Sequence, residues 1–163
     1  MQLAGLAWCQ RGKHLCVTPG SLDARRGGGV SVGGGSRGDG FAVARRFPST
    51  AQSVADARHF ARGVCDTWHI ASASDVEICV SEVVANAVVH GHGTVEVELV
   101  RTPWGVRVAV SDDERALPVV KPPTHDGEGG RGMAVLSALA MRWAARPTDG
   151  GKVVWFHVSD RPR

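Results

Sequence analysis

The sequence predicts an α/β fold of the α+β type: a two-layer sandwich with a mixed, mostly antiparallel sheet and its helices on one face. Several segments alternate apolar and polar side chains at the period of a half-buried strand. Two stretches after the first such segment instead repeat apolar residues at helical spacing. The chain has 163 residues, of which 43% are hydrophobic, so it can build one core.

Bulk composition excludes several classes of protein. The net charge is only +3 and the basic residues are scattered, so a nucleic-acid partner is not expected. No apolar stretch reaches the roughly 20 residues needed to span a bilayer, and the first residues are too polar for a signal peptide. The four cysteines lack zinc-site spacing and are expected to be free thiols: Cys9, Cys16, Cys65 and Cys79. These features predict a soluble, cytoplasmic protein.

The first 40 residues differ in composition from the rest. The segment 26–40 reads RGGGVSVGGGSRGDG and has too few apolar side chains to offset the entropy of ordering it. We therefore expect residues 1–40 to form a flexible Gly/Arg-rich tail and residues 41–159 to form the domain. Alternatively, the arginines contact a partner or the glycines cradle phosphate, although no strand-to-helix context surrounds them.

The domain is predicted to begin with a strand and a helix. Residues 41–47 (FAVARRF) alternate as a strand, and Pro48 and Ser49 then break it. Apolar residues recur at helical spacing from Val54 onward, with Ser49 or Thr50 available as the N-cap. This helix is expected to run to about Trp68.

A second helix follows near Ser74. Ser74 and Glu77 have the spacing of a capping box, which predicts the helix start. The pattern continues to about His90, where Gly91 and Gly93 stop it.

The rest of the chain is predicted to be mostly strands. A hairpin joins 94–101 to 106–111 through a turn at 103–105, and a polar, Pro-rich loop occupies 112–130. A short helix and two strands complete the domain: 133–140, 141–146 and 153–158.

Three polar residues stand out on the second helix. Glu82, Asn86 and His90 are four residues apart, so each step drifts only about 40° and the three line one helix face. A carboxylate beside a carboxamide suits Mg²⁺, which takes oxygen ligands and bridges to phosphates. The carboxylate alternatively accepts a proton from an attacking hydroxyl. The same trio would also fit an ordinary solvated face.

Two downstream features favour a ligand over a solvated face. Asp112 follows a predicted strand, where its carboxylate can accept a hydrogen bond from the exocyclic amine of a purine. The segment 127–133 (GEGGRGM) opens a helix with glycines whose backbone N–H groups can approach phosphate oxygens. Arg131 adds a charge-assisted contact.

These motifs together resemble a known superfamily. EVVANAVVHG at 82–91, then Asp112, GGRGM at 129–133 and GGKVVWF at 150–156 are similar to the ATPases that include gyrase B, histidine kinases and MutL. More closely, they resemble the stand-alone anti-sigma-factor serine/threonine kinases of bacteria. The resemblance covers 41–159 and implies the histidine kinase-like ATPase fold, or Bergerat fold, with ATP and Mg²⁺ as cofactors.

The resemblance also implies roles for individual residues. Glu82 would be the catalytic base, or orient the nucleophile, and Asn86 would hold Mg²⁺. Asp112 would recognise adenine and His90 would lie near the phosphates or simply close the helix. The lid over the phosphates would include Gly130, Arg131, Gly132 and Met133.

Two departures from the family pattern bear on nucleotide binding. Asp112 is followed by DERA where relatives have Asp-x-Gly-x-Gly, and Val153 and Val154 stand where a Thr often precedes the last aromatic pair. Both predict weaker nucleotide binding than in typical relatives.

The function implied by the resemblance is phosphorylation of a serine on an anti-anti-sigma partner, together with sequestration of a sigma factor. The departures favour an alternative, a non-catalytic ATP-binding module that binds a protein partner. A detached catalytic half of a histidine kinase is a weaker reading, because His59 and His69 lack the setting of a phosphoacceptor. Relatives commonly form homodimers, and the sequence leaves that state open.

Overall fold

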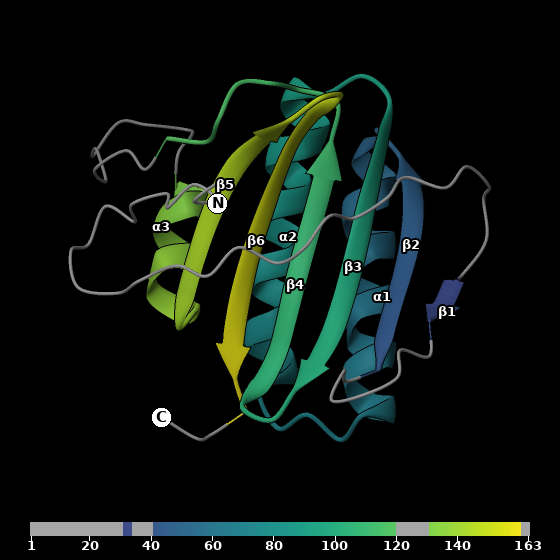
Figure 1. The fold of residues 1–163 in the computed structure, drawn as a ribbon, viewed down its shortest axis with the longest axis vertical. Helices are drawn as coiled ribbons and strands as arrows, with labels where there is room; N and C mark the ends of the chain where they lie inside the picture. Colours follow the sequence, from purple (N-terminus) through teal and green to yellow (C-terminus); the bar gives the residue numbers. More distant parts are fainter. Residues whose placement is uncertain (1–30, 34–40, 120–130, 161–163) are drawn as a thin grey trace, which may run out of the picture.

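The computed structural model describes residues 31–33, 41–119 and 131–160, in which three helices lie against one side of an antiparallel sheet (Figure 1). The strands are β1 (Ser31–Gly33), β2 (Ala42–Pro48), β3 (Thr94–Thr102), β4 (Gly105–Asp112), β5 (Arg142–Thr148) and β6 (Gly151–Ser159). The helices are α1 (Ala51–Thr67), α2 (Ala73–His90) and α3 (Arg131–Leu139). None of these helices combines the length and the apolar run that a bilayer crossing requires.

The sheet order is β1-β2-β3-β4-β6-β5, and every pairing among these strands is antiparallel. The predicted two-layer α+β sandwich is confirmed. The sheet was predicted to be mixed and mostly antiparallel, and all its described strand pairs are antiparallel. The helices α1 and α2 connect β2 to β3, whereas α3 connects β4 to the edge strand β5. The chain then returns through β6, which lies between β4 and β5 (Figure 1).

A short strand lies inside the segment predicted to be a flexible tail. β1 pairs with the outer edge of β2, in the register Ser31 to Ala44 and Gly33 to Ala42. These three residues therefore form a strand, whereas residues 1–40 were expected to be a flexible tail. The other tail residues, including Cys9 and Cys16, lie outside the described residues, and the domain boundary at 41 stays a prediction.

The core lies between the sheet and the helix layer. Strand alternation directs one set of side chains toward the helices, and these are almost fully buried: Val95, Val97, Leu99, Val106, Val108, Val110, Val154, Phe156 and Val158. Cys65 of α1 and Cys79 of α2 pack in the same core as free thiols, as predicted. Burial raises the pKa of the Cys65 thiol to about 12, so this thiol stays protonated at neutral pH.

The start of α2 differs from the predicted capping box. The N-cap is Ser72, no side chain of the helix caps it, and Ser74 lies inside the first turn. Instead the carboxylate of Asp160, beyond β6, accepts hydrogen bonds from the backbone N–H groups of Ala71 and Ser72 at 2.6 and 3.4 Å. An anion near a helix N-terminus is stabilising, so a distant residue does the work expected of a local one.

The face of the sheet without helices contains a buried histidine. His157 of β6 is only 2% exposed, and its neighbours across the sheet are Arg107 of β4 and Arg142 of β5. Its Nε2 lies 2.9 Å from the hydroxyl of Thr102. Burial lowers the pKa of His157 below its usual 6.5, and the charges of Arg142 and Arg107 lower it further.

This lowered pKa predicts that acid destabilises the fold through His157. The contribution of His157 is fully present above the unfolded pKa of 6.5 and is lost as pH falls through the lower folded pKa, because the unfolded chain then binds the extra proton. We expect His157→Gln to reduce the loss of unfolding free energy between about pH 7.5 and about pH 5.5, measured by urea denaturation. His59→Gln, on the exposed side of α1, is the matched control. Equal losses in wild type and His157→Gln would contradict the prediction.

Candidate functional site

The polar stripe predicted on the second helix lies on α2, beside a fully apolar face. Helical spacing directs one side of α2 into the core: Val76, Val80, Val83, Val84 and Ala87. Glu82 and Asn86 are half-buried, and His90 is exposed at the last turn of the helix. Among the described residues, none hydrogen-bonds the side chain of Glu82 or Asn86.

Glu82 meets the glycine-rich start of α3. A Cβ added at Gly132 would lie 2.5 Å from Glu82 Oε2 and 3.4 Å from Glu82 Cβ. A glycine therefore lets the first turn of α3 pack directly against the carboxylate. Residues 50 positions apart in the chain are brought together at this point, where backbone N–H groups of a helix start are available to an anion.

The predicted lid residues that the structure describes differ in how exposed their side chains are. Gly130 lies outside the described residues, whereas Arg131 is exposed at the first position of α3. Met133 is 5% exposed and belongs to the core, so its side chain serves packing and its backbone N–H is the group left for a phosphate. Its placement in the lid therefore rests on the backbone.

Asp112 lies at the end of β4 and is held by a residue that sequence reasoning missed. Its Oδ1 accepts a hydrogen bond from Lys152 Nζ at 2.9 Å, in an ion pair whose side chains are 1% (Lys152) and 3% (Asp112) exposed. Lys152 stands directly opposite Asp112 in the β4–β6 register. The one signal in the sequence was the lysine of GGKVVWF, an isolated charge at the start of an apolar strand.

The next residue, Asp113, connects β4 to the end of α2. Its Oδ1 accepts the backbone N–H of His92 at 3.0 Å. A Cβ at Gly91 or Gly93 would lie 2.8 or 2.6 Å from the Asp113 carboxylate oxygens, and a Cβ at Gly91 would also lie 2.7 Å from the Ala87 carbonyl oxygen. The two glycines that were predicted to stop the helix thus also make room for Asp113.

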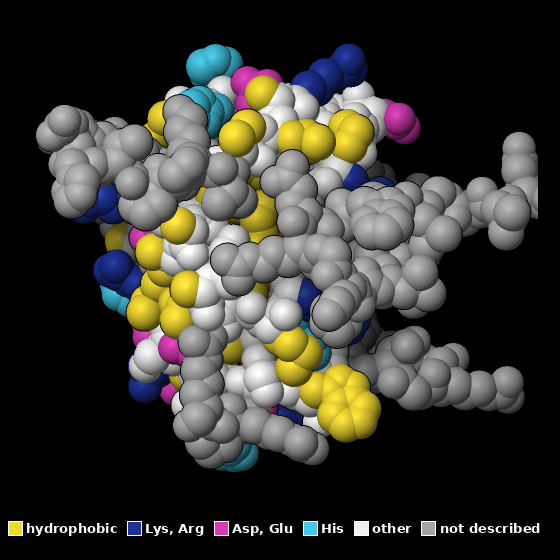
Figure 2. Space-filling model, turned by 90° about the vertical axis from the view of Figure 1, so that its left-hand side faces the viewer, with side chains coloured by type: hydrophobic (Ala, Val, Ile, Leu, Met, Phe, Trp, Pro, Cys, Tyr) yellow, Lys and Arg dark blue, Asp and Glu magenta, His cyan; other side chains and the backbone are white. Residues whose placement is uncertain are grey.

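Glu114 completes a charged group at this end of the molecule. Its carboxylate accepts the backbone N–H of Ala116 at 2.8 Å, which chiefly lowers the pKa of Glu114, and Lys152 and His90 lower it further. Asp112, Glu114 and Lys152 are therefore neighbours. Figure 2 shows histidine, acidic and basic side chains gathered at the upper end of the molecule, where α2, β4 and β6 meet in Figure 1.

The donor set fits a Mg²⁺ ion that a phosphate shares, rather than one that the protein holds alone. Within the described ranges, no three His, Cys, Asp or Glu side chains cluster closely enough to hold a metal. Mg²⁺ usually keeps several waters and takes one or two protein oxygens plus substrate phosphates. Glu82 and Asn86, beside the start of α3, are a set of that size.

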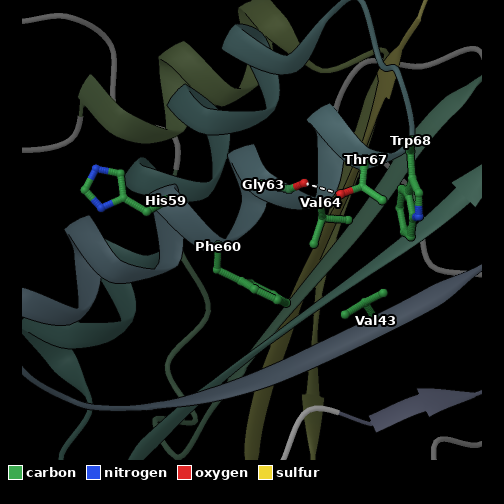
Figure 3. A pocket seen from close by; sticks show the side chains of 7 residues that line it. All are labelled: Val43, His59, Phe60, Gly63, Val64, Thr67 and Trp68. Atoms are coloured by element: carbon green, nitrogen blue, oxygen red, sulfur yellow. Dashed lines mark hydrogen bonds between the residues drawn. The ribbon is translucent and has the colours of Figure 1, made fainter.

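A separate cavity of about 330 Å³ lies between α1 and β2. Phe60 and Val64 of α1 point into it toward Val43 of β2, and Thr67 bonds back to the Gly63 carbonyl of its own helix (Figure 3). Its walls carry no carboxylate or carboxamide. The cavity is on the α1 side of α2, whereas Gly132 and Glu82 meet on the α3 side (Figure 1), so we place the functional site at the latter.

The family of the chain follows from a comparison with models of known protein families. The family model of the histidine kinase-like ATPase domain matches residues 47–158, more than half of the chain. None of the curated proteins compared with the chain matches it.

Proposed function

The chain belongs to the histidine kinase-like ATPase family, and from this membership we propose an ATP-dependent regulatory protein of the anti-sigma-factor type. Membership implies ATP binding. The finer proposal is a serine/threonine kinase that phosphorylates an anti-anti-sigma partner and sequesters a sigma factor. The observation that carries it is the contact of Glu82 with Gly132, which joins a carboxylate to a glycine-rich helix start.

Each site residue has a proposed task in phosphoryl transfer. Glu82 accepts the proton of the attacking serine hydroxyl or orients that hydroxyl. Asp112 accepts the exocyclic N–H of adenine. The backbone N–H groups at the start of α3 and the Arg131 guanidinium bind phosphate oxygens, because both carry positive charge toward an anion. His90, exposed at the end of α2, is proposed to lie near the phosphates.

Asn86 is the proposed Mg²⁺ ligand, through its amide oxygen. When bound, the ion neutralises charge on the phosphates during transfer. The protein supplies few oxygens of its own, so we expect metal and nucleotide to bind together rather than separately.

This joint binding predicts a large effect at Asn86. We expect wild type to bind ATP in calorimetry only with Mg²⁺, and Asn86→Ala to weaken that binding at least about tenfold, since one charge-assisted contact is lost. Ser81→Ala on the same helix is the control, because its hydroxyl bonds the Glu77 carbonyl of its own helix. Absence of ATP binding by wild type would remove the proposed function.

The second candidate is a non-catalytic module that binds ATP and a protein partner. The sequence departures favour it, because the glycines expected after Asp112 and the Thr expected near Val153 are both missing. Incubation with labelled ATP and serine-containing partner candidates separates the two. ATP binding without transfer to any partner would favour the module. A measurement of the molecular mass of the same preparation in solution shows whether the protein forms a homodimer.

A further inference from the structure

The ion pair between Asp112 and Lys152 is built into the end of the sheet. The two residues are direct cross-strand partners, at the last position of β4 and the second position of β6. Strand alternation puts both on the helix-facing side, in line with Val110 and Val154 of the core. A lysine that is 1% exposed on such a face is unusual unless it has a charged partner.

The hydrogen bonds around this pair distinguish the two oxygens of Asp112. Oδ1 accepts both Lys152 Nζ and the backbone N–H of Glu114, each at 2.9 Å. Lys152 Nζ also lies 3.3 Å from the Glu114 carbonyl. Within the described part of the chain, no residue donates a hydrogen bond to Oδ2. One oxygen is thus saturated inside the protein, and the other is left for a ligand.

The close approach of β6 to β4 fixes this arrangement further. A Cβ at Gly151 would lie 1.9 Å from the Asp112 carbonyl oxygen and 2.6 Å from Asp113 Cα. Glycine therefore allows the backbone of the residue before Lys152 to reach the end of β4. Rotation of the Asp112 carboxylate would break two hydrogen bonds at once.

We infer that Lys152 is a positioning residue that selects the nucleobase through Asp112. By holding Oδ1, Lys152 presents Oδ2 as a fixed acceptor, which fits a base with an exocyclic amine and opposes one with a carbonyl at that position. This inference rests on the proposed ATP binding at the site. Lys152 itself, with both its acceptors inside the protein, does not contact the base.

The test compares ligands that differ at one group. Affinities are measured for ATP and for purine riboside triphosphate, in which hydrogen replaces the exocyclic amine. We expect wild type to prefer ATP by about tenfold or more, as for a hydrogen bond to a charged group. In Lys152→Met the preference should fall to less than about threefold, with little change in affinity for the analogue.

A purely structural role gives a different result. Both affinities would then fall together and the preference would remain, which would overturn the inference. Arg107→Met is the matched control: it removes an ion pair with Glu98 from the other face of β4, the strand that carries Asp112. Its preference should equal that of wild type.

A second variant keeps the test valid if Lys152→Met does not fold. Asp112→Asn/Lys152→Met removes both charges, and such neutral replacements of buried pairs are often tolerated. The double variant is compared with Asp112→Asn alone, so that the two proteins differ only at Lys152. An equal preference for ATP in these two variants would also overturn the inference. No ATP binding by wild type would instead overturn the proposed function itself, so the two failures are distinguishable.

Discussion

Lys152→Met is expected to lower the free energy of unfolding by about 3–5 kcal/mol, because it leaves the Asp112 carboxylate buried without its cation. The pair is almost completely removed from water, so neither solvent nor salt replaces the lost partner. This loss is comparable to a large part of a small domain's total stability of roughly 5–15 kcal/mol. Urea denaturation followed by tryptophan fluorescence measures it.

Two variants define what the Lys152→Met result means. Asp112→Asn/Lys152→Met should recover most of the stability, because no unpaired charge remains. Arg107→Met, which breaks a more exposed ion pair of 4.0 Å, should cost less than about 1 kcal/mol. A Lys152→Met protein as stable as wild type would mean that the buried pair contributes nothing to the fold.

Glu82→Gln is expected to lower the rate of phosphoryl transfer by about 10²- to 10⁴-fold, the usual loss when a general base is removed. The amide has nearly the same shape as the carboxylate, so its packing over Gly132 is kept and ATP affinity should change only slightly. Glu77→Gln serves as the control, since Glu77 lies on the same helix but pairs with Arg62 of α1. Transfer is measured with labelled ATP and a serine-containing partner.

The outcome for Glu82 separates the two proposed functions. A protein that binds ATP and transfers nothing, in wild type and Glu82→Gln alike, is the binding module. A Glu82→Gln protein with full transfer activity would instead show that another group takes the proton.

Local patterns were enough to predict the elements and their order. Alternation in TVEVELVR and VRVAVS marks strands because the helix-facing side chains of β3 and β4 are core. The polar stripe on α2 stands out because much of the rest of the helix is core. The repeat of apolar side chains along a strand or helix involves only residues that are close in the sequence, so it can be recognised without the structure. The start of α2, predicted near Ser74, lies at Ala73, but the predicted capping box is not formed. Asp160, some 86 positions downstream of Ser74, bonds the backbone at this end instead.

The candidate site was predictable in its parts but not in its connections. Glu82 and Gly132 were identified separately, and their contact depends on how α3 packs beside α2. Lys152 was given no role, because its partner is set by the β4–β6 register rather than by any local motif. Burial of Met133 likewise follows from tertiary packing, since its place after the glycines suggested a lid.

The helix α2 is fastened at both ends by carboxylates from outside it. Asp160 bonds the backbone just before its first turn, and Asp113 bonds the backbone just after its last. The backbone between them is therefore held in place before any ligand arrives, and with it the backbone positions of Glu82, Asn86 and His90. A nucleotide that binds there loses little free energy to ordering this helix, so a modest set of contacts can still give useful affinity.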